Sequence, residues 1–188
     1  MRNGTARVVE KTEIKAKPEE VFAFMDDIRN VGWHMEGGRS MALFGGKLTL
    51  DTFSEQDRGV GATYRWRGKV MGLTIDFAEV VTKWVRNREK VWRTLDGAKI
   101  IIMSGYEMRF NLTPTDDGTL VTFEIEYEPP RSWLGRIVGK ILARRYSKWC
   151  LRRAVGDAKR ILELSRPPVI QASRYSSTPF QPNSQSTG

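Results

Sequence analysis

Cysteine and histidine are almost missing from this chain of 188 residues, which has one of each, Cys150 and His34. A single cysteine cannot form a disulfide within the chain, and thiolate or imidazole metal sites need several such ligands. A Ser-His-Asp or Cys-His catalytic device would have to use His34 itself. We therefore predict no metal site, no other cofactor and no catalytic residue of these kinds.

Long apolar runs are missing as well. The densest one, at residues 100–103, is far shorter than a membrane span, and the first seven residues lack the apolar core of a signal peptide. The near absence of cysteine fits a reducing compartment. We expect a cytoplasmic protein, and we leave open whether it contacts the inner face of the membrane.

Acidic residues are scarce in one segment only. Residues 131–164 contain ten Lys or Arg and two Asp or Glu, and so carry a net +8 of the chain's +9. Three interpretations stand, in decreasing order of weight: a solvated helix face, contact with an anionic membrane, and nucleic-acid binding. The membrane interpretation rests on cations interleaved with apolar residues, and it assigns the contact to Arg136, Lys140, Arg144, Arg145 and Lys148.

Alternation with a period of two dominates the middle of the chain and predicts β-strands. Turn residues such as Asp96-Gly97 separate the alternating segments, and such short connections favour antiparallel neighbours. Including one strand near the N-terminus, the predicted strands lie at about residues 7–15, 39–53, 61–70, 73–83, 88–95, 100–112 and 119–127.

A short helix is predicted after the first strand. Pro18 followed by two glutamates is the expected chemistry of a helix start, and Asp26-Asp27 and Asn30-Val31-Gly32 close the pattern. Trp33 and His34 then lie on a second short helix or a loop.

A long helix is predicted over residues 132–164. Its two apolar stripes do not line up, so either the helix bends near residues 143–150 or its two halves face different surroundings. Residues 165–188 are rich in Ser, Pro and Gln. We expect them to form a disordered tail, which leaves one domain at residues 1–164.

Three segments carry a family resemblance. Residues 14–27 resemble the opening signature of the SRPBCC superfamily, the START-like, helix-grip group of the polyketide cyclase/dehydrase and lipid transport type. Gly59-Val60-Gly61 resembles its mid-sheet block, and residues 111–123 resemble its last hairpin. The resemblance covers about residues 5–164. It implies an α+β helix-grip fold, in which a seven-stranded curved antiparallel sheet wraps around the long C-terminal helix, with two short helices after the first strand.

The resemblance also implies a cavity between the sheet and the C-terminal helix, which binds an apolar small molecule such as a lipid, a quinone or a polyketide-like compound. The inward strand positions are rich in aromatic residues and methionine, which suit an adaptable apolar pocket. From periodicity alone such a stripe is more often plain core. The candidate cavity residues are Trp33, His34, Tyr64, Trp66, Phe77, Ser104, Tyr106, Met108, Phe123, Tyr127, Ile141 and Trp149.

Two alternatives to ligand binding or transport stay open. An enzyme of the cyclase/dehydrase type could use a pocket carboxylate as acid or base, and Glu10 and Glu79 share strand parity with apolar residues. A membrane-docking adaptor would use the basic helix instead. We favour binding over catalysis, and the sequence identifies neither the ligand nor the oligomeric state.

Overall fold

The computed structural model describes residues 5–32, 46–52, 58–70, 72–96, 98, 100, 102–130 and 133–164. The predicted tail at residues 165–188 lies outside this part of the chain, and so do Trp33 and His34. For residues 133–141 the helical backbone is described and the side chains are not.

One antiparallel sheet of seven strands forms the body of the molecule, in the order β1-β7-β6-β5-β4-β3-β2. The meander is confirmed, and the first strand closes it by pairing with the last one. β6 begins at Gly105, five residues later than predicted. The strands are β1 (Ala6–Ile14), β2 (Lys47–Thr52), β3 (Thr63–Val70), β4 (Leu73–Val85), β5 (Glu89–Thr94), β6 (Gly105–Thr115) and β7 (Gly118–Glu128).

A bulge near the end of β4 changes which residues face inward. The register with β5 shifts between Val81 and Lys83, so Val81 lies opposite Trp92 whereas Trp84 lies opposite Lys90. Before the shift the odd-numbered residues point inward, and after it Trp84 does. Alternation alone cannot place Trp84, because it assumes an unbroken period of two.

Two short helices follow β1, α1 (Pro18–Asp26) and α2 (Ile28–Gly32). At the start of α1 the Lys17 backbone N–H donates to the Glu20 carboxylate at 2.8 Å. The predicted pair of short helices after the first strand is confirmed. The first helix ends at Asp26, because Asp27 adopts an extended conformation. The Asp27 carboxylate then accepts a hydrogen bond from the Arg29 backbone N–H at 2.9 Å and starts the second helix.

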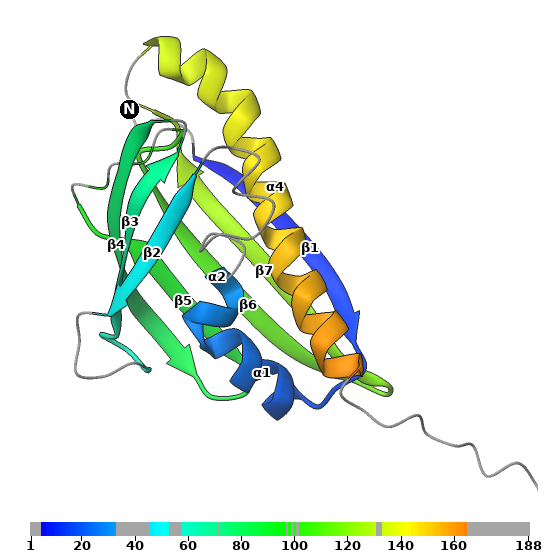
Figure 1. Cartoon of the computed structure of the whole chain (residues 1–188). Coiled ribbons are helices and arrows are strands. Elements are labelled where there is room, and N and C mark those ends of the chain that lie inside the picture. Colours follow the sequence, from blue (N-terminus) through cyan, green and yellow to red (C-terminus); the bar gives the residue numbers. More distant parts are fainter. Residues whose placement is uncertain are drawn as a thin grey trace, which may run out of the picture.

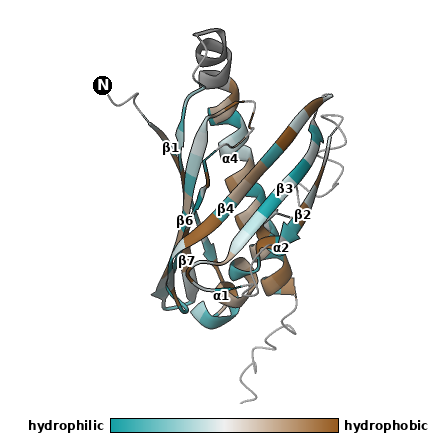
Figure 2. Cartoon of the chain, turned by 90° about the vertical axis from the view of Figure 1, so that its left-hand side faces the viewer, coloured by the Kyte–Doolittle hydropathy of each residue, from teal (hydrophilic) through white to brown (hydrophobic). Residues whose placement is uncertain are grey.

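The long helix α4 (Trp133–Leu164) lies along the concave side of the sheet, with most of its contacts to β1 (Figure 1). α1 and α2 lie across one end of the sheet, and the sheet curves around α4 (Figure 2). The predicted C-terminal stripe packs inward. It belongs to a continuous row of buried or half-buried residues that also includes small and polar side chains: Ala143, Tyr146, Ser147, Cys150, Leu151, Ala154, Val155 and Ala158.

The hairpin between β6 and β7 touches the end of β1 closely. A Cβ atom added at Gly118 would lie 2.2 Å from the Ile14 carbonyl oxygen, so only glycine fits there. The neighbouring Thr119 hydroxyl donates to the Ala16 carbonyl oxygen at 2.7 Å. None of the helices in the described part of the chain has the length and apolar character needed to cross a membrane.

Candidate functional site

Glu79 is a carboxylic acid at the centre of the inner face of β4. It shares its inward parity with Phe77 and Val81, and its exposed fraction is 1%. In register it lies between Tyr64 on β3 and Thr94 on β5. A carboxyl group removed from water at such a position requires hydrogen-bond partners.

Three donors from neighbouring strands surround this carboxyl. The Trp66 indole N–H donates to Oε2 at 3.0 Å, and the Trp92 indole N–H donates to Oε1 at 3.1 Å. The Tyr106 hydroxyl donates to Oε1 at 2.5 Å. Since an indole N–H can only donate, both tryptophans need an acceptor at this place, which a carboxyl oxygen provides.

Burial changes the acidity of the pair formed by Glu79 and Tyr106. Loss of hydration raises the pKa of the Glu79 carboxyl, and the three hydrogen bonds offset part of that rise. Loss of hydration and the nearby Glu79 charge raise the pKa of the Tyr106 hydroxyl well above its usual range. Tyr106 therefore keeps its proton at ordinary pH.

A second buried polar cluster joins α1 to β5. The Lys90 ammonium, 1% exposed, lies 2.9 Å from Oδ1 of Asp26 and donates to the Asp26 backbone oxygen at 2.5 Å. The Trp84 indole N–H donates to the same Oδ1 at 3.0 Å. Half-exposed Arg58 lies 4.0 Å from Oδ2. The bulge in β4 is what brings Trp84 to this cluster.

Aromatic rings connect the two clusters. The Lys90 ammonium lies 5.4 Å from the centre of the Tyr64 ring and 5.7 Å from that of the Trp92 ring. Trp92 therefore meets Lys90 with its ring while its N–H donates to Glu79. Burial lowers the pKa of Lys90, and Asp26 counteracts this effect most strongly.

The helix adds a third set of groups opposite the sheet. Tyr146 and Cys150 of α4 share a hydrogen bond, and their proximity contributes to the raised pKa of Tyr106. Burial raises the pKa of the Cys150 thiol to about 12. The Ser147 hydroxyl is fully buried and has no hydrogen-bond partner among the described residues.

Most predicted cavity residues of the strands share the inner face. Ser104 directly precedes β6, and its hydroxyl donates to the Pro129 carbonyl oxygen at 3.0 Å. Trp149 is half-buried on α4, and Trp33, His34 and the Ile141 side chain lie outside the described residues. Tyr64, Trp66, Phe77, Phe123 and Tyr127 are buried, and Tyr106 and Met108 are half-buried.

Other predicted residues have different surroundings. Glu10 forms a salt bridge of 3.2 Å with Arg152 of α4, so its carboxylate is already paired with a cation. Among the predicted membrane-contact residues, the side chains of Arg136 and Lys140 lie outside the described part. The remaining three, Arg144, Arg145 and Lys148, are exposed.

Sequence reasoning missed Asp26, Lys90, Trp92 and Tyr146 as members of the buried clusters. Lys90 and Trp92 are two residues apart on β5 and therefore share one face of the strand, so strand parity held a usable signal for them. Asp26 carried no such signal, because an acid at a helix end is ordinarily solvated.

Comparison with known proteins places the chain in a family context. The profile of a family described as polyketide cyclase/dehydrase and lipid transport matches residues 5–163. A search of curated proteins found no match.

Solved structures with a similar fold share little sequence with the chain. TTHA0849 from Thermus thermophilus is 18% identical with a TM-score of 0.63, and the match covers 86% of this chain and 100% of that one. The aromatase/cyclase Zhui from Streptomyces sp. R1128 is 13% identical with a TM-score of 0.61, and the match covers 84% and 95% of the two chains.

A longer protein also matches. The di-domain ARO/CYC StfQ from the steffimycin biosynthetic pathway is 12% identical with a TM-score of 0.64. The match covers 87% of this chain and 52% of StfQ, so the chain corresponds to about half the length of that protein. At these identities the similarity establishes the helix-grip fold and nothing finer.

Proposed function

The chain belongs to the polyketide cyclase/dehydrase and lipid transport family, and on that premise we propose that it binds an apolar small molecule between the inner face of the sheet and α4. The ligand carries at least one hydroxyl or carbonyl group. Lipids, quinones and polyketide-like compounds are the chemical classes that fit this description.

The observation that carries the proposal concerns Tyr106, Tyr146 and Cys150. Loss of hydration is the main cause that raises the pKa of all three groups, so they lie deep between sheet and helix. Each residue nevertheless keeps part of its surface uncovered. A close-packed core would leave no such surface, so the uncovered surface of these residues supports an interior space beside them.

The chemistry of this region suits an apolar ligand with few polar contacts. Phe77, Met108 and Phe123 offer apolar surface, and aromatic and methionine side chains adapt to ligands of different shape. Tyr106 and Tyr146, which keep part of their surface uncovered, are the groups available to a ligand hydroxyl or carbonyl. Few, well-placed polar groups are what orients a ligand in such a site.

The test measures binding of Nile red, a neutral apolar fluorophore that the basic residues do not attract. We expect saturable fluorescence enhancement, and a compound in the organic extract of the purified protein that displaces the dye. Cys150→Phe adds a ring at the interior position. It should weaken dye binding at least about tenfold, because the ring occupies the space that the dye would fill. Leu142→Phe, at an exposed position of the same helix, is the matched control.

Two results would overturn the proposal. One is the absence of saturable binding by the wild-type protein. The other is equal binding by the Cys150→Phe and wild-type proteins while circular dichroism shows both to be folded, because the dye would then bind elsewhere.

A second candidate function is acid–base catalysis of the cyclase/dehydrase kind, and the Glu79–Tyr106 pair favours it. A carboxyl with a raised pKa and a neighbouring protonated hydroxyl are suited to the loss of water from a β-hydroxy ketone. Glu79 would take the proton from the carbon next to the carbonyl. Tyr106 would protonate the leaving hydroxyl, and Glu79 would return the proton to Tyr106.

This second function is tested with the compound extracted from the protein or its hydrated precursor. Glu79→Gln and Tyr106→Phe should each abolish turnover while Nile red binding stays within about threefold of wild type. Turnover that survives both substitutions would remove these residues from the reaction.

A further inference from the structure

The solvent side of α4 carries positive charge along most of its length. From Trp133 to Gly156 the helix has no Asp or Glu. Arg145, Lys148, Arg152 and Arg153 fall on the side away from the buried row, because successive helical residues are rotated by about 100°. Arg144 is exposed too, at the edge of the buried row, seven residues before Leu151. We define the basic face as these cations together with two apolar residues on the same side: Leu142, Arg144, Arg145, Lys148, Trp149, Arg152 and Arg153.

Among the residues that the structure describes, only the far end of the basic face is neutralised by acidic side chains. Arg152 pairs with Glu10 at 3.2 Å, and Arg153 pairs with Asp157 at 3.4 Å. Arg144, Arg145 and Lys148 form no salt bridge with any residue that the structure describes. Three neighbouring cations without counter-charge repel one another, and an external anionic partner would relieve that repulsion.

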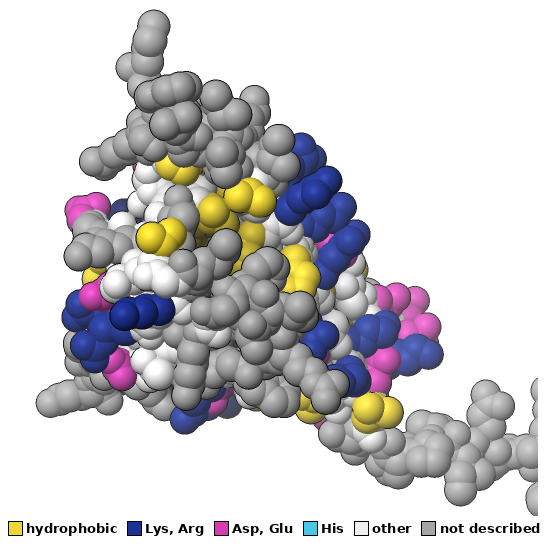
Figure 3. Space-filling view, turned by 45° about the horizontal axis from the view of Figure 1, so that its top comes forward, with side chains coloured by type: hydrophobic (Ala, Val, Ile, Leu, Met, Phe, Trp, Pro, Cys, Tyr) yellow, Lys and Arg dark blue, Asp and Glu magenta, His cyan; other side chains and the backbone are white. Residues whose placement is uncertain are grey.

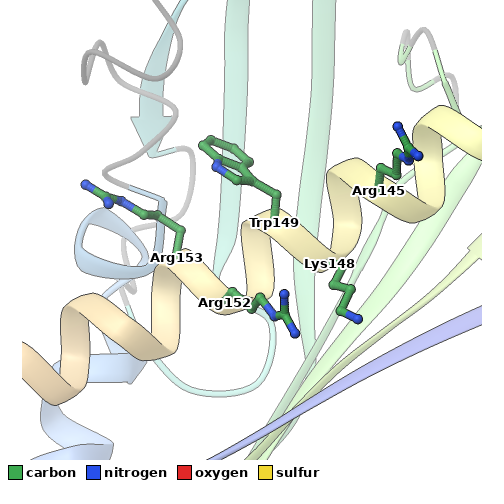
Figure 4. A pocket seen from close by; sticks show the side chains of 5 residues that line it. All are labelled: Arg145, Lys148, Trp149, Arg152 and Arg153. Carbon is green, nitrogen blue, oxygen red and sulfur yellow. The ribbon is translucent and has the colours of Figure 1, made fainter.

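Trp149 lies in the middle of these cations. Arg145 and Arg153 stand one helical turn on either side of it, and Figure 4 shows them extending away from the helix with the indole between them. Together with Lys148 and Arg152 they line an open groove of about 400 Å³. Trp149 is half-buried, with its ring 5.8 Å from that of Tyr146.

Apolar surface continues along the same helix face. Leu142 is seven residues before Trp149 and therefore lies on the same side, with an exposed fraction of 49%. Viewed from the end opposite α1 and α2, hydrophobic side chains gather beside a band of Lys and Arg (Figure 3). Indole and leucine side chains flanked by cations are the composition of an interfacial helix.

We propose that the basic face docks on an anionic lipid bilayer. Arg144, Arg145 and Lys148 pair with lipid phosphates, while Trp149 and Leu142 rest at the boundary between headgroups and acyl chains. Nucleic acid fits this face less well. Base stacking needs free aromatic rings, and on the described part of the face the one ring present is packed against Tyr146. The proposal does not depend on the interior ligand, since the cations of the basic face are exposed and lie outside the buried clusters.

The experiment is co-sedimentation of the full chain with vesicles of phosphatidylcholine alone or mixed with phosphatidylglycerol. We expect binding to the mixed vesicles only, and release when salt is raised, because salt screens charges on the surface. Arg145→Glu combined with Lys148→Glu should lower the partition coefficient at least about tenfold. Lys11→Glu combined with Lys69→Glu changes the net charge equally at exposed strand positions, and this control should bind like wild type.

Three outcomes would overturn the proposal. The first is failure of the wild-type chain to bind the mixed vesicles at low salt. The second is an equal loss in both double variants, which would indicate attraction by net charge without a defined face. The third is displacement from vesicles by a short DNA duplex whose own binding depends on Arg145 and Lys148. Trp149→Ala should weaken vesicle binding while circular dichroism remains unchanged.

Discussion

The Tyr106 hydroxyl donates a 2.5 Å hydrogen bond to Oε1 of Glu79 from two strands away. Thr94 stands between them in the sheet, and its small side chain leaves room for the tyrosine ring above it. This hydrogen bond joins β6 and β4, the two strands on either side of β5, through side chains alone. It is therefore sensitive to the removal of a single oxygen atom.

Tyr106→Phe should destabilise the protein by about 1.5–3 kcal/mol, because a buried carboxyl loses one of its donors. Urea denaturation measures the free energy of unfolding. Tyr127→Phe removes a hydroxyl from the same face, where it contacts no carboxylate among the described residues, and should cost less than about 1 kcal/mol. Equal costs for the two variants would contradict the role assigned to the Glu79 hydrogen bond.

Lys90→Met should cost about 3–5 kcal/mol, because it leaves the Asp26 carboxylate buried without its cation. Lys83→Met is the matched control on the neighbouring strand. Its exposed ammonium pairs with Glu89, and its removal should cost at most about 1 kcal/mol. Adding Asp26→Asn to Lys90→Met should recover part of the loss. A Lys90 variant as stable as the Lys83 variant would show that the buried pair is not needed.

The raised pKa of Glu79 predicts a pH dependence with a definite sign. The folded protein holds this proton more tightly than the unfolded chain, whose carboxyl has the ordinary value of 4.5. Its contribution to stability is complete below that value and is lost as the pH rises through the folded pKa. As the pH rises above 4.5, unfolding free energies should fall with pH more steeply for wild type than for Glu79→Gln, until the folded pKa has been passed.

Asp27 should give a pH dependence of stability with the opposite sign, and it serves as the comparison for Glu79. Arg29 lowers the pKa of its carboxyl, so the stability that it contributes is lost as the pH falls through the folded pKa. Asp27→Asn should therefore flatten the acid side of the profile and leave the neutral side unchanged.

Identical profiles for wild type and Glu79→Gln would contradict the burial of an ionisable Glu79.

Cys150 should be almost unreactive in the folded protein. With a pKa of about 12, roughly one thiol in ten thousand is ionised at pH 8, and the thiolate is the reactive form. Labelling with Ellman's reagent should be slow until guanidinium unfolds the chain, and Cys150→Ser should not react at all. Rapid labelling of the native protein would place this thiol in contact with water.

Replacing either of two glycines by alanine should change the stability of the protein, in opposite directions at the two positions. Gly118→Ala places a methyl group 2.2 Å from the Ile14 carbonyl oxygen and should destabilise the protein by about 2–3 kcal/mol or more. Gly156 lies inside α4, with nothing within 4 Å of an added Cβ. Gly156→Ala should stabilise the protein by about 0.5–1 kcal/mol, and thermal unfolding distinguishes the two.

The strands and the long helix were predictable, because each repeats one local pattern over many residues. Periods of two placed β3 and β7 within two residues of their observed ends. The turn residues between consecutive strands implied antiparallel neighbours. The break between α1 and α2 was not predictable in this way. It depends on one carboxylate, Asp27, that accepts a backbone hydrogen bond instead of continuing the helix.

The site was predictable only where its residues alternate regularly. Tyr64, Trp66 and Glu79 follow strand parity, and Glu79 was singled out as an inward carboxyl. The partnership of Asp26 with Lys90 joins residues 64 positions apart, and no local pattern encodes it. The inward position of Trp84 could not be predicted for another reason, because the bulge in β4 reverses the strand parity just before it.

The pairing of β1 with β7 sets the order in which this chain can fold. Ile14 pairs with Thr119 and Ala6 with Tyr127, whereas the strands from β2 to β7 pair with their neighbours in sequence. The meander can grow hairpin by hairpin at small entropic cost, but joining β1 to β7 closes a loop of more than a hundred residues. During synthesis β1 must wait for β7 to emerge from the ribosome, and until then its unpaired edge is open to any other strand nearby.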